Sequence, residues 1–178
     1  ITSSVVARRS ILDAVGLFDT SLSTSEDFDL WLRIAMQGGR IRYTPEPLVT
    51  RTMRPGGLSA NRERMLRGMI DVYSLAQGRT ESQELTAEIR CQRTLVRANL
   101  SLATAKRVLR EGDHLRATQL FKRAASVLRR PKLWIVYCLS RVAPGLLGRF
   151  LSVRDEVSPR HQARDQRATT SFTKRSNR

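Results

Sequence analysis

Hydrophobic and polar positions predict two short helices and two short strands in the first fifty residues. Residues 25–37 carry apolar side chains three and four positions apart, which is the spacing of an amphipathic helix. Residues 9–15 are predicted to form a shorter helix, which Gly16 ends because glycine accepts the left-handed backbone at a helix end. Residues 40–44 alternate as a short strand does, and residues 1–6 are expected to form a strand or an extended entry.

The pattern becomes helical from about residue 59 onward. Three helices are predicted, over residues 59–78, 82–110 and 115–128, and a turn at Gly112 and Asp113 joins the last two. These two helices and their turn resemble a single tetratricopeptide-type helical hairpin, in which two antiparallel helices approach closely around a tight turn. Because one such repeat cannot bury its own face, we expect it to pack on the first part of the chain or on a partner.

A seven-residue apolar run, residues 133–139, follows the predicted hairpin. Arg141 and Pro144 interrupt a longer apolar stretch, so the segment is too short to span a bilayer. Basic residues flank the run, and it contains Trp and Tyr, so one interpretation places it on an anionic membrane face. The other, which we favour, makes it a last core helix that caps the hairpin.

Charge is spread unevenly along the 178 residues, which carry a net charge of +16. Residues 129–178 hold twelve basic and three acidic residues, whereas residues 1–58 hold seven and six. The excess of positive charge predicts a basic tail. This tail either contacts an anionic surface, such as lipid or nucleic acid, or is solvated and disordered. Residues 153–178 lack apolar periodicity, which favours disorder.

The two cysteines are isolated from one another and from histidine. Cys91 and Cys138 form no Cys-x-x-Cys pair, so neither a zinc site nor a disulfide framework is indicated. Two free thiols fit a reducing compartment.

A short acidic run begins the helix predicted over residues 25–37. Glu26, Asp27 and Asp29 follow Thr24 and Ser25, either of which is a good N-cap residue. A paired Glu-Asp at a helix start suits sugar transfer, because one carboxylate there can take the proton from an attacking hydroxyl. The alternative is that these acids only stabilise the helix through its dipole. For Asp29 we favour a structural role, an ion pair with Arg33 four residues on.

An ordered series of short motifs surrounds the acidic run. The motifs are Thr2-Ser3-Ser4, Gly16-Leu17-Phe18-Asp19, Glu26-Asp27-Phe28-Asp29-Leu30-Trp31-Leu32-Arg33, Gly38-Gly39, Pro45-Glu46-Pro47-Leu48 and Pro55-Gly56-Gly57-Leu58-Ser59. In that order they resemble the C-terminal half of the catalytic domain of family-two glycosyltransferases, which have the GT-A fold. The resemblance covers about residues 1–60, a third of the chain.

The resemblance implies an α/β fold for residues 1–60, as the acceptor-side half of a GT-A, nucleotide-diphospho-sugar transferase-like domain. Residues 61–152 are then a helical extension and residues 153–178 a basic tail, so the chain as a whole is mostly α. In the family, the half with the nucleotide site and its Asp-x-Asp metal motif precedes this segment. We therefore expect the chain to be a fragment that is inactive alone.

The resemblance also implies a reaction and the residues that perform it. The Asp of the Glu-Asp pair, here Asp27, is the general base of an inverting displacement, and Glu26 helps to hold the base or an acceptor hydroxyl. The donor is a nucleotide-diphosphate sugar, and the acceptor is a saccharide, a lipid carrier or a protein. A divalent cation, Mg²⁺ or Mn²⁺, is expected as cofactor, held mainly by the missing half.

Three further side chains are candidates for substrate binding. Trp31 has the spacing of a core residue, which we favour, but an aromatic ring there can also stack on a sugar. Arg51 and Arg54 are suited to bidentate contact with phosphate. Many relatives carry a metal- or diphosphate-binding His near the position of Arg54, whose guanidinium cannot ligate a metal but can contact diphosphate directly.

Two other functions compete with the enzyme. The helical hairpin could make the chain a non-catalytic protein-interaction module. Nucleic-acid binding by the basic tail is disfavoured, since Phe172 is its one stacking aromatic. For the enzyme we expect a cytoplasmic location, peripheral at the inner face of the cell membrane, where an anionic surface would meet the basic C-terminal segment.

Overall fold

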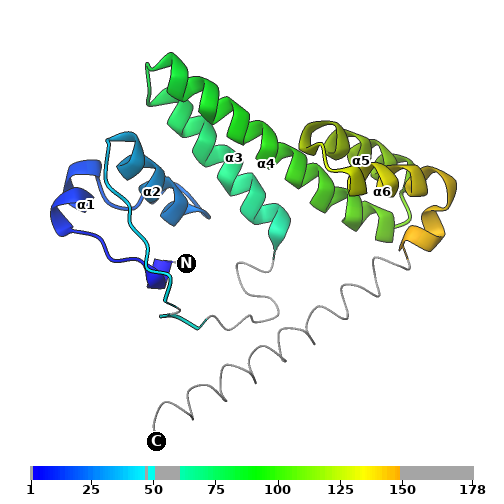
Figure 1. Cartoon of the computed structure of the whole chain (residues 1–178), viewed down its shortest axis with the longest axis horizontal. Coiled ribbons are helices and arrows are strands. Elements are labelled where there is room, and N and C mark those ends of the chain that lie inside the picture. Colours follow the sequence, from blue (N-terminus) through cyan, green and yellow to red (C-terminus); the bar gives the residue numbers. More distant parts are fainter. Residues whose placement is uncertain (1, 47, 51–60, 149–178) are drawn as a thin grey trace, which may run out of the picture. The chain divides into compact units, whose positions relative to one another are not determined.

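The computed structural model describes residues 2–46, 48–50 and 61–148, without the side chain of Ser3 (Figure 1). Its regular elements are one short 3₁₀ turn followed by six α-helices: η1 (Thr2–Ser4), α1 (Arg9–Val15), α2 (Glu26–Met36), α3 (Arg62–Gly78), α4 (Gln83–Arg110), α5 (His114–Leu128) and α6 (Pro131–Val142). Residues 144–148 are again helical.

The predicted α/β, GT-A segment is wrong, because the described residues contain no strand. Thr2–Ser4 forms the 3₁₀ turn instead, closed by a hydrogen bond from Val5 N to Thr2 O at 3.1 Å. Residues 40–44 have no regular structure, and Ile41 is exposed. A strand needs a partner backbone for its hydrogen bonds, and a short alternating pattern carries no information about that partner.

Two glycines, Gly38 and Gly39, end α2 just after residue 37, the last residue of the predicted helix. Gly38 has a φ of 75°, and its N–H donates to Ala35 O at 3.0 Å. The N–H of Gly39 donates to Ile34 O at 2.9 Å. This pair of bonds is the Schellman motif, which satisfies carbonyl oxygens at a helix end. A Cβ on Gly39 would lie 2.7 Å from Ile34 O and 3.2 Å from Ile11 Cδ1, so this turn also brings α1 close to α2.

The structure divides into two compact units between Ala103 and Thr104, within α4. The predicted domain limits stay predictions, and the one at residue 60 lies outside the described residues. In the first unit, Leu30 and Ile34 of α2 and Val72 of α3 are buried. Trp31, which has the spacing of a core residue, is only half-buried.

The second unit is built mainly from α5 and α6, which pack closely together. Four small or aromatic side chains of α5 are buried, Ala117, Phe121, Ala124 and Ala125. The predicted turn at Gly112 is present, with a φ of 88°, and Asp113 caps α5 by accepting from Arg116 N at 3.1 Å. The predicted tetratricopeptide-like hairpin of α4 and α5 stays a prediction, and the close packing that the structure shows for α5 is with α6. Among the described helices, none combines the length and apolar character needed to cross a bilayer.

Candidate active site at the start of α2

The chain enters α2 through a residue with an unusual backbone. Ser25 has φ 66° and ψ 22°, in the left-handed region that non-glycine residues seldom adopt. It occupies the predicted N-cap position, but its side chain makes no capping hydrogen bond. The side chain is buried and its hydroxyl lies 3.3 Å from that of Thr24. Such strained residues tend to cluster at functional sites.

Asp27 lies in the first turn of α2 and is half-buried. One carboxylate oxygen, Oδ1, accepts from Phe28 N at 2.7 Å. The other, Oδ2, accepts from the Thr2 hydroxyl at 2.9 Å, across 25 positions of sequence. The turn η1 therefore lies beside the start of α2. The neighbouring Glu26 is exposed.

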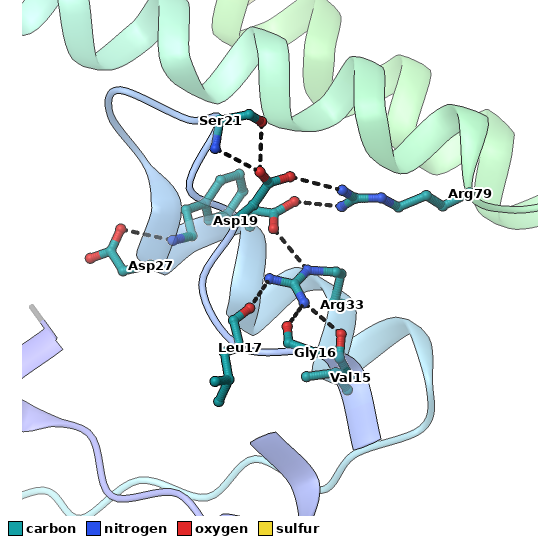
Figure 2. A network of polar contacts seen from close by, with 10 residues as sticks. Val15, Gly16, Leu17, Asp19, Ser21, Asp27, Arg33 and Arg79 are labelled. Atoms are coloured by element: carbon teal, nitrogen blue, oxygen red, sulfur yellow. Dashed lines mark hydrogen bonds and ion pairs between the residues drawn. The ribbon is translucent and has the colours of Figure 1, made fainter. Parts of the chain in front are cut away.

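Asp29, two residues further on, lies in a different environment. Its side chain is only 1% exposed and pairs with two arginines: Arg33 Nε donates to Oδ2 at 2.8 Å and Arg79 Nη1 donates to Oδ1 at 2.6 Å. Figure 2 shows that Asp27 points away from Arg33 and Arg79. The first turn of α2 thus has a structural acid on one side and a more accessible acid on the other.

Arg33 uses its remaining N–H groups to hold the end of α1. Its Nη1 donates to Val15 O at 2.6 Å and to Gly16 O, and its Nη2 donates to Leu17 O at 2.7 Å (Figure 2). These carbonyl oxygens belong to the last residue of α1 and the two residues after it, where intrahelical donors run out. A single guanidinium therefore joins α1 to the buried carboxylate of Asp29.

Arg79 extends the same network to the loop before α2. Its Nη2 lies 3.3 Å from Asp19 Oδ2, and the Ser21 hydroxyl donates to Asp19 Oδ1 at 2.6 Å. The hydroxyl and backbone N–H of Ser21 lower the pKa of Asp19, with smaller contributions from the charges of Arg79 and Arg33. The carboxylates of Asp19 and Asp29 and the guanidiniums of Arg33 and Arg79 thus form one network, in which the formal charges cancel.

Contacts spread along α3 hold the whole segment that leads into α2. Arg64 Nη2 donates to Ser23 O at 3.3 Å. A Cβ on Gly68 would lie 2.5 Å from Thr24 Oγ1 and 2.9 Å from Ser25 Oγ, so only glycine allows this approach. The rings of Phe28 and Tyr73 meet edge to face at 5.4 Å between centroids. Burial, with a smaller effect of the Glu88 carboxylate, raises the pKa of the Tyr73 hydroxyl.

An open hollow of about 430 Å³ lies beside this network. Its lining residues are Val15, Gly16, Leu17, Phe18, Asp19, Arg33 and Arg79. Glu26 and Asp27 do not line it.

The family model described as "Glycosyl transferase family group 2" matches residues 1–151. The chain belongs to this family. No curated protein and no solved structure matches it significantly. The match extends well past residues 1–60, on which the sequence resemblance rests. As a glycosyltransferase, the protein uses a sugar donor and an acceptor.

The structure brings some predicted residues of this glycosyltransferase together and leaves others undescribed. Glu26 and Asp27 share the first turn of α2, and Trp31 follows one turn later. Arg51 and Arg54 lie outside the described residues. The roles of all five stay predictions, whereas the predicted pair of Asp29 with Arg33 is confirmed.

Two residues that contact the acids of α2, Arg79 and Thr2, were not predicted from the sequence. Arg79 looks like any basic residue after a helix, although a buried Asp29 with one local partner needs a second. Thr2 belongs to a motif of the resemblance, but nothing in the sequence links it to Asp27. Within the described part of the chain, no group of three acidic, histidine or cysteine side chains is arranged to hold a metal.

Proposed function

We propose that this glycosyltransferase transfers a sugar with inversion from a nucleotide-diphosphate donor to an acceptor hydroxyl, with Asp27 as the general base. The Asp27 carboxylate takes the proton from the acceptor hydroxyl, and the acceptor oxygen forms a bond to the anomeric carbon. The bond from that carbon to the diphosphate breaks, and the nucleoside diphosphate leaves with the bonding electrons. Attack from the side opposite the leaving group inverts the anomeric centre.

The observation that carries this proposal is the pairing of Asp27 with Thr2. A carboxylate oxygen can accept two hydrogen bonds, and Asp27 Oδ2 accepts one, from the Thr2 hydroxyl. A further position on this half-buried carboxylate is thus left for an acceptor hydroxyl.

The framework around α2 supports the proposal because a catalytic base must be held in place. Misplacement by about 1 Å can cost roughly a hundredfold in rate. Asp29 and Arg33 fix α2 to α1, and Arg79 and Gly68 fix the entry of α2 to α3. Asp27 itself remains outside this ion-pair network.

The remaining substrate contacts are proposed on chemistry alone. Glu26 is exposed in the same turn and is suited to accept a hydrogen bond from a second acceptor hydroxyl. Trp31 can stack on a sugar face, and Arg51 and Arg54 carry the charge that a diphosphate requires. We also propose a divalent cation as cofactor. The described residues include no group of side chains arranged to bind a metal.

The test is turnover by the full-length protein with a panel of nucleotide-diphosphate sugars, followed as release of nucleoside diphosphate. Asp27→Asn keeps the shape of the side chain and removes the base, so we expect kcat to fall by about 10²–10⁴-fold. Donor binding, measured by calorimetry, should persist because the base acts on the acceptor.

The matched control is Asp13→Asn, which removes an exposed carboxylate from α1. Asp13 pairs with Arg9 at 2.9 Å on the surface, and we expect turnover to stay unchanged. Unchanged turnover in Asp27→Asn would instead show that the Glu-Asp pair serves only to start the helix.

A further inference from the structure

Helix α6 has two apolar faces. One face carries Leu133, Val136, Tyr137 and Ser140, which are buried or half-buried. Ser140 O accepts from Thr118 Oγ1 of α5 at 3.3 Å, so this face packs against α5. The expectation of a core helix thus explains only half of α6.

The opposite face of α6 is exposed to solvent. It consists of Trp134, Ile135, Cys138, Leu139 and Val142, which we call the outer face. Ile135 is 60% exposed and Val142 85%. At 3.6 residues per turn these positions cover one arc of roughly 140°. A contiguous exposed apolar surface commonly marks an interaction site.

Basic side chains border the outer face on both sides. By helical spacing, Lys132 lies at one edge of the arc and Arg141 at the other, and both are exposed. Arg129 and Arg130 precede the helix and are exposed as well. Residues 129–148 contain these four basic residues and no acidic residue.

We propose that the outer face of α6 docks on an anionic lipid surface. An apolar stripe bordered by cations lies in the plane of a membrane interface, with the apolar side chains among the acyl chains and the cations at the headgroups. Trp134 lies at the edge of the stripe, where an amphipathic ring is placed at headgroup level. This proposal does not rest on the proposed reaction.

The positive charge around the outer face disfavours a second copy of the chain as the partner that binds there. Two outer faces brought together would place four cations opposite four cations, which opposes association. An apolar protein partner would leave Lys132 and Arg141 without a counterpart. An anionic bilayer offers acyl chains to the apolar side chains of the outer face and negatively charged headgroups to the cations at its edges.

The experiment uses the full chain with vesicles of phosphatidylcholine alone and of an equal mixture with phosphatidylglycerol. Trp134 and Trp31 are the two tryptophans of the chain, so Trp31→Phe leaves Trp134 as the reporter. With the anionic vesicles we expect the Trp134 emission to shift to the blue and to be quenched by lipids brominated on the acyl chains. Phosphatidylcholine alone should give neither effect.

Two pairs of substitutions test the outer face against matched controls. Ile135→Ser with Val142→Ser should abolish the shift and quenching of Trp134. Ile41→Ser with Leu48→Ser removes two comparably exposed apolar side chains elsewhere, 68% and 72% exposed, and should change nothing.

The charged border is tested in the same way. Lys132→Gln with Arg141→Gln should lower the partition coefficient roughly thirtyfold, at about fivefold per cation. Arg90→Gln with Arg97→Gln removes the same charge from exposed positions of α4 and should have little effect.

Several outcomes would overturn the proposal. Binding to anionic vesicles without quenching of Trp134 would assign it to other basic residues. A dimer in solution that Ile135→Ser with Val142→Ser dissociates would show that a second copy covers the outer face. Absence of binding to either vesicle would exclude a lipid surface.

Discussion

The region around α2 and the α5–α6 pair are held together by different interactions. Around α2, the buried Asp29 pairs with Arg33 and Arg79, and Arg33 also binds carbonyl oxygens at the end of α1. In α5 the buried side chains are apolar, with Phe121 the largest.

This difference matches the tasks that we propose for the two regions. Charge-assisted hydrogen bonds are directional, so they fix the orientation of α2 and of the acids in its first turn. Apolar packing has no direction, and it holds α6 on α5 by one face while the outer face stays free. A polar framework thus suits a reaction site, and apolar packing suits a docking helix.

Replacing Asp29 should have the largest effect on stability. Asp29→Asn keeps the shape of the side chain but leaves Arg33 and Arg79 opposite a neutral amide. We expect the free energy of unfolding of this region to fall by about 2–4 kcal/mol, less than for a fully buried pair because Arg79 is partly exposed. Urea denaturation followed by Trp31 emission, in a Trp134→Phe background, measures it.

The counterpart in the other region is Phe121→Leu, at an equally buried position of α5. An apolar side chain of similar size replaces the ring, so we expect a loss below about 1.5 kcal/mol. Trp134 emission in a Trp31→Phe background reports this change. Equal losses at Asp29 and Phe121 would contradict the contrast between the two regions.

A methyl group on Gly68 should disturb the entry to α2. Gly68→Ala would ordinarily favour a helix, but here the Cβ meets Thr24 and Ser25 below 3.0 Å. We expect a net loss of about 1–3 kcal/mol together with reduced turnover. Gly78→Ala, on the same helix with nothing within 4 Å of its Cβ, is the control. Equal stability of the two variants would show that α3 does not position this segment.

The smallest expected effect is the pH dependence of stability that the Asp19 carboxyl causes. Its pKa is lowered in the folded protein, mainly by the hydrogen bond from the Ser21 hydroxyl. The ionised carboxylate therefore stabilises the fold fully at pH values above the pKa of Asp19 in the unfolded chain. The contribution disappears as pH falls below about 4, through the folded pKa. Wild type should therefore lose more stability on acidification than Asp19→Asn, as measured by the unfolding midpoint against pH. A carboxyl pKa at or above the ordinary aspartate value, by NMR, would contradict this.

Local features of the fold and the site were predictable from the sequence. The start of α2, its end at Gly38 and the pair of Asp29 with Arg33 all depend on residues within one or two turns. Periodicity and helix-end chemistry report such neighbours directly.

Contacts between distant residues were not predictable. Arg79 reaches Asp29 across 50 positions and Thr2 reaches Asp27 across 25, and neither pairing leaves a trace in local spacing. The predicted strand at residues 40–44 failed for the same reason, because a strand depends on a neighbour that alternation cannot reveal. The exposed outer face of α6 depends on which side meets α5.

The most direct test of the account is the turnover of Asp27→Asn compared with its stability. We expect kcat of the full-length protein to fall by about 10²–10⁴-fold, while the urea midpoint reported by Trp31, in a Trp134→Phe background, stays near that of the same background with Asp27 intact. This result would separate the reactive acid from the structural acid two residues away. Full turnover in Asp27→Asn would contradict the account, and so would a loss of activity that follows unfolding of α2.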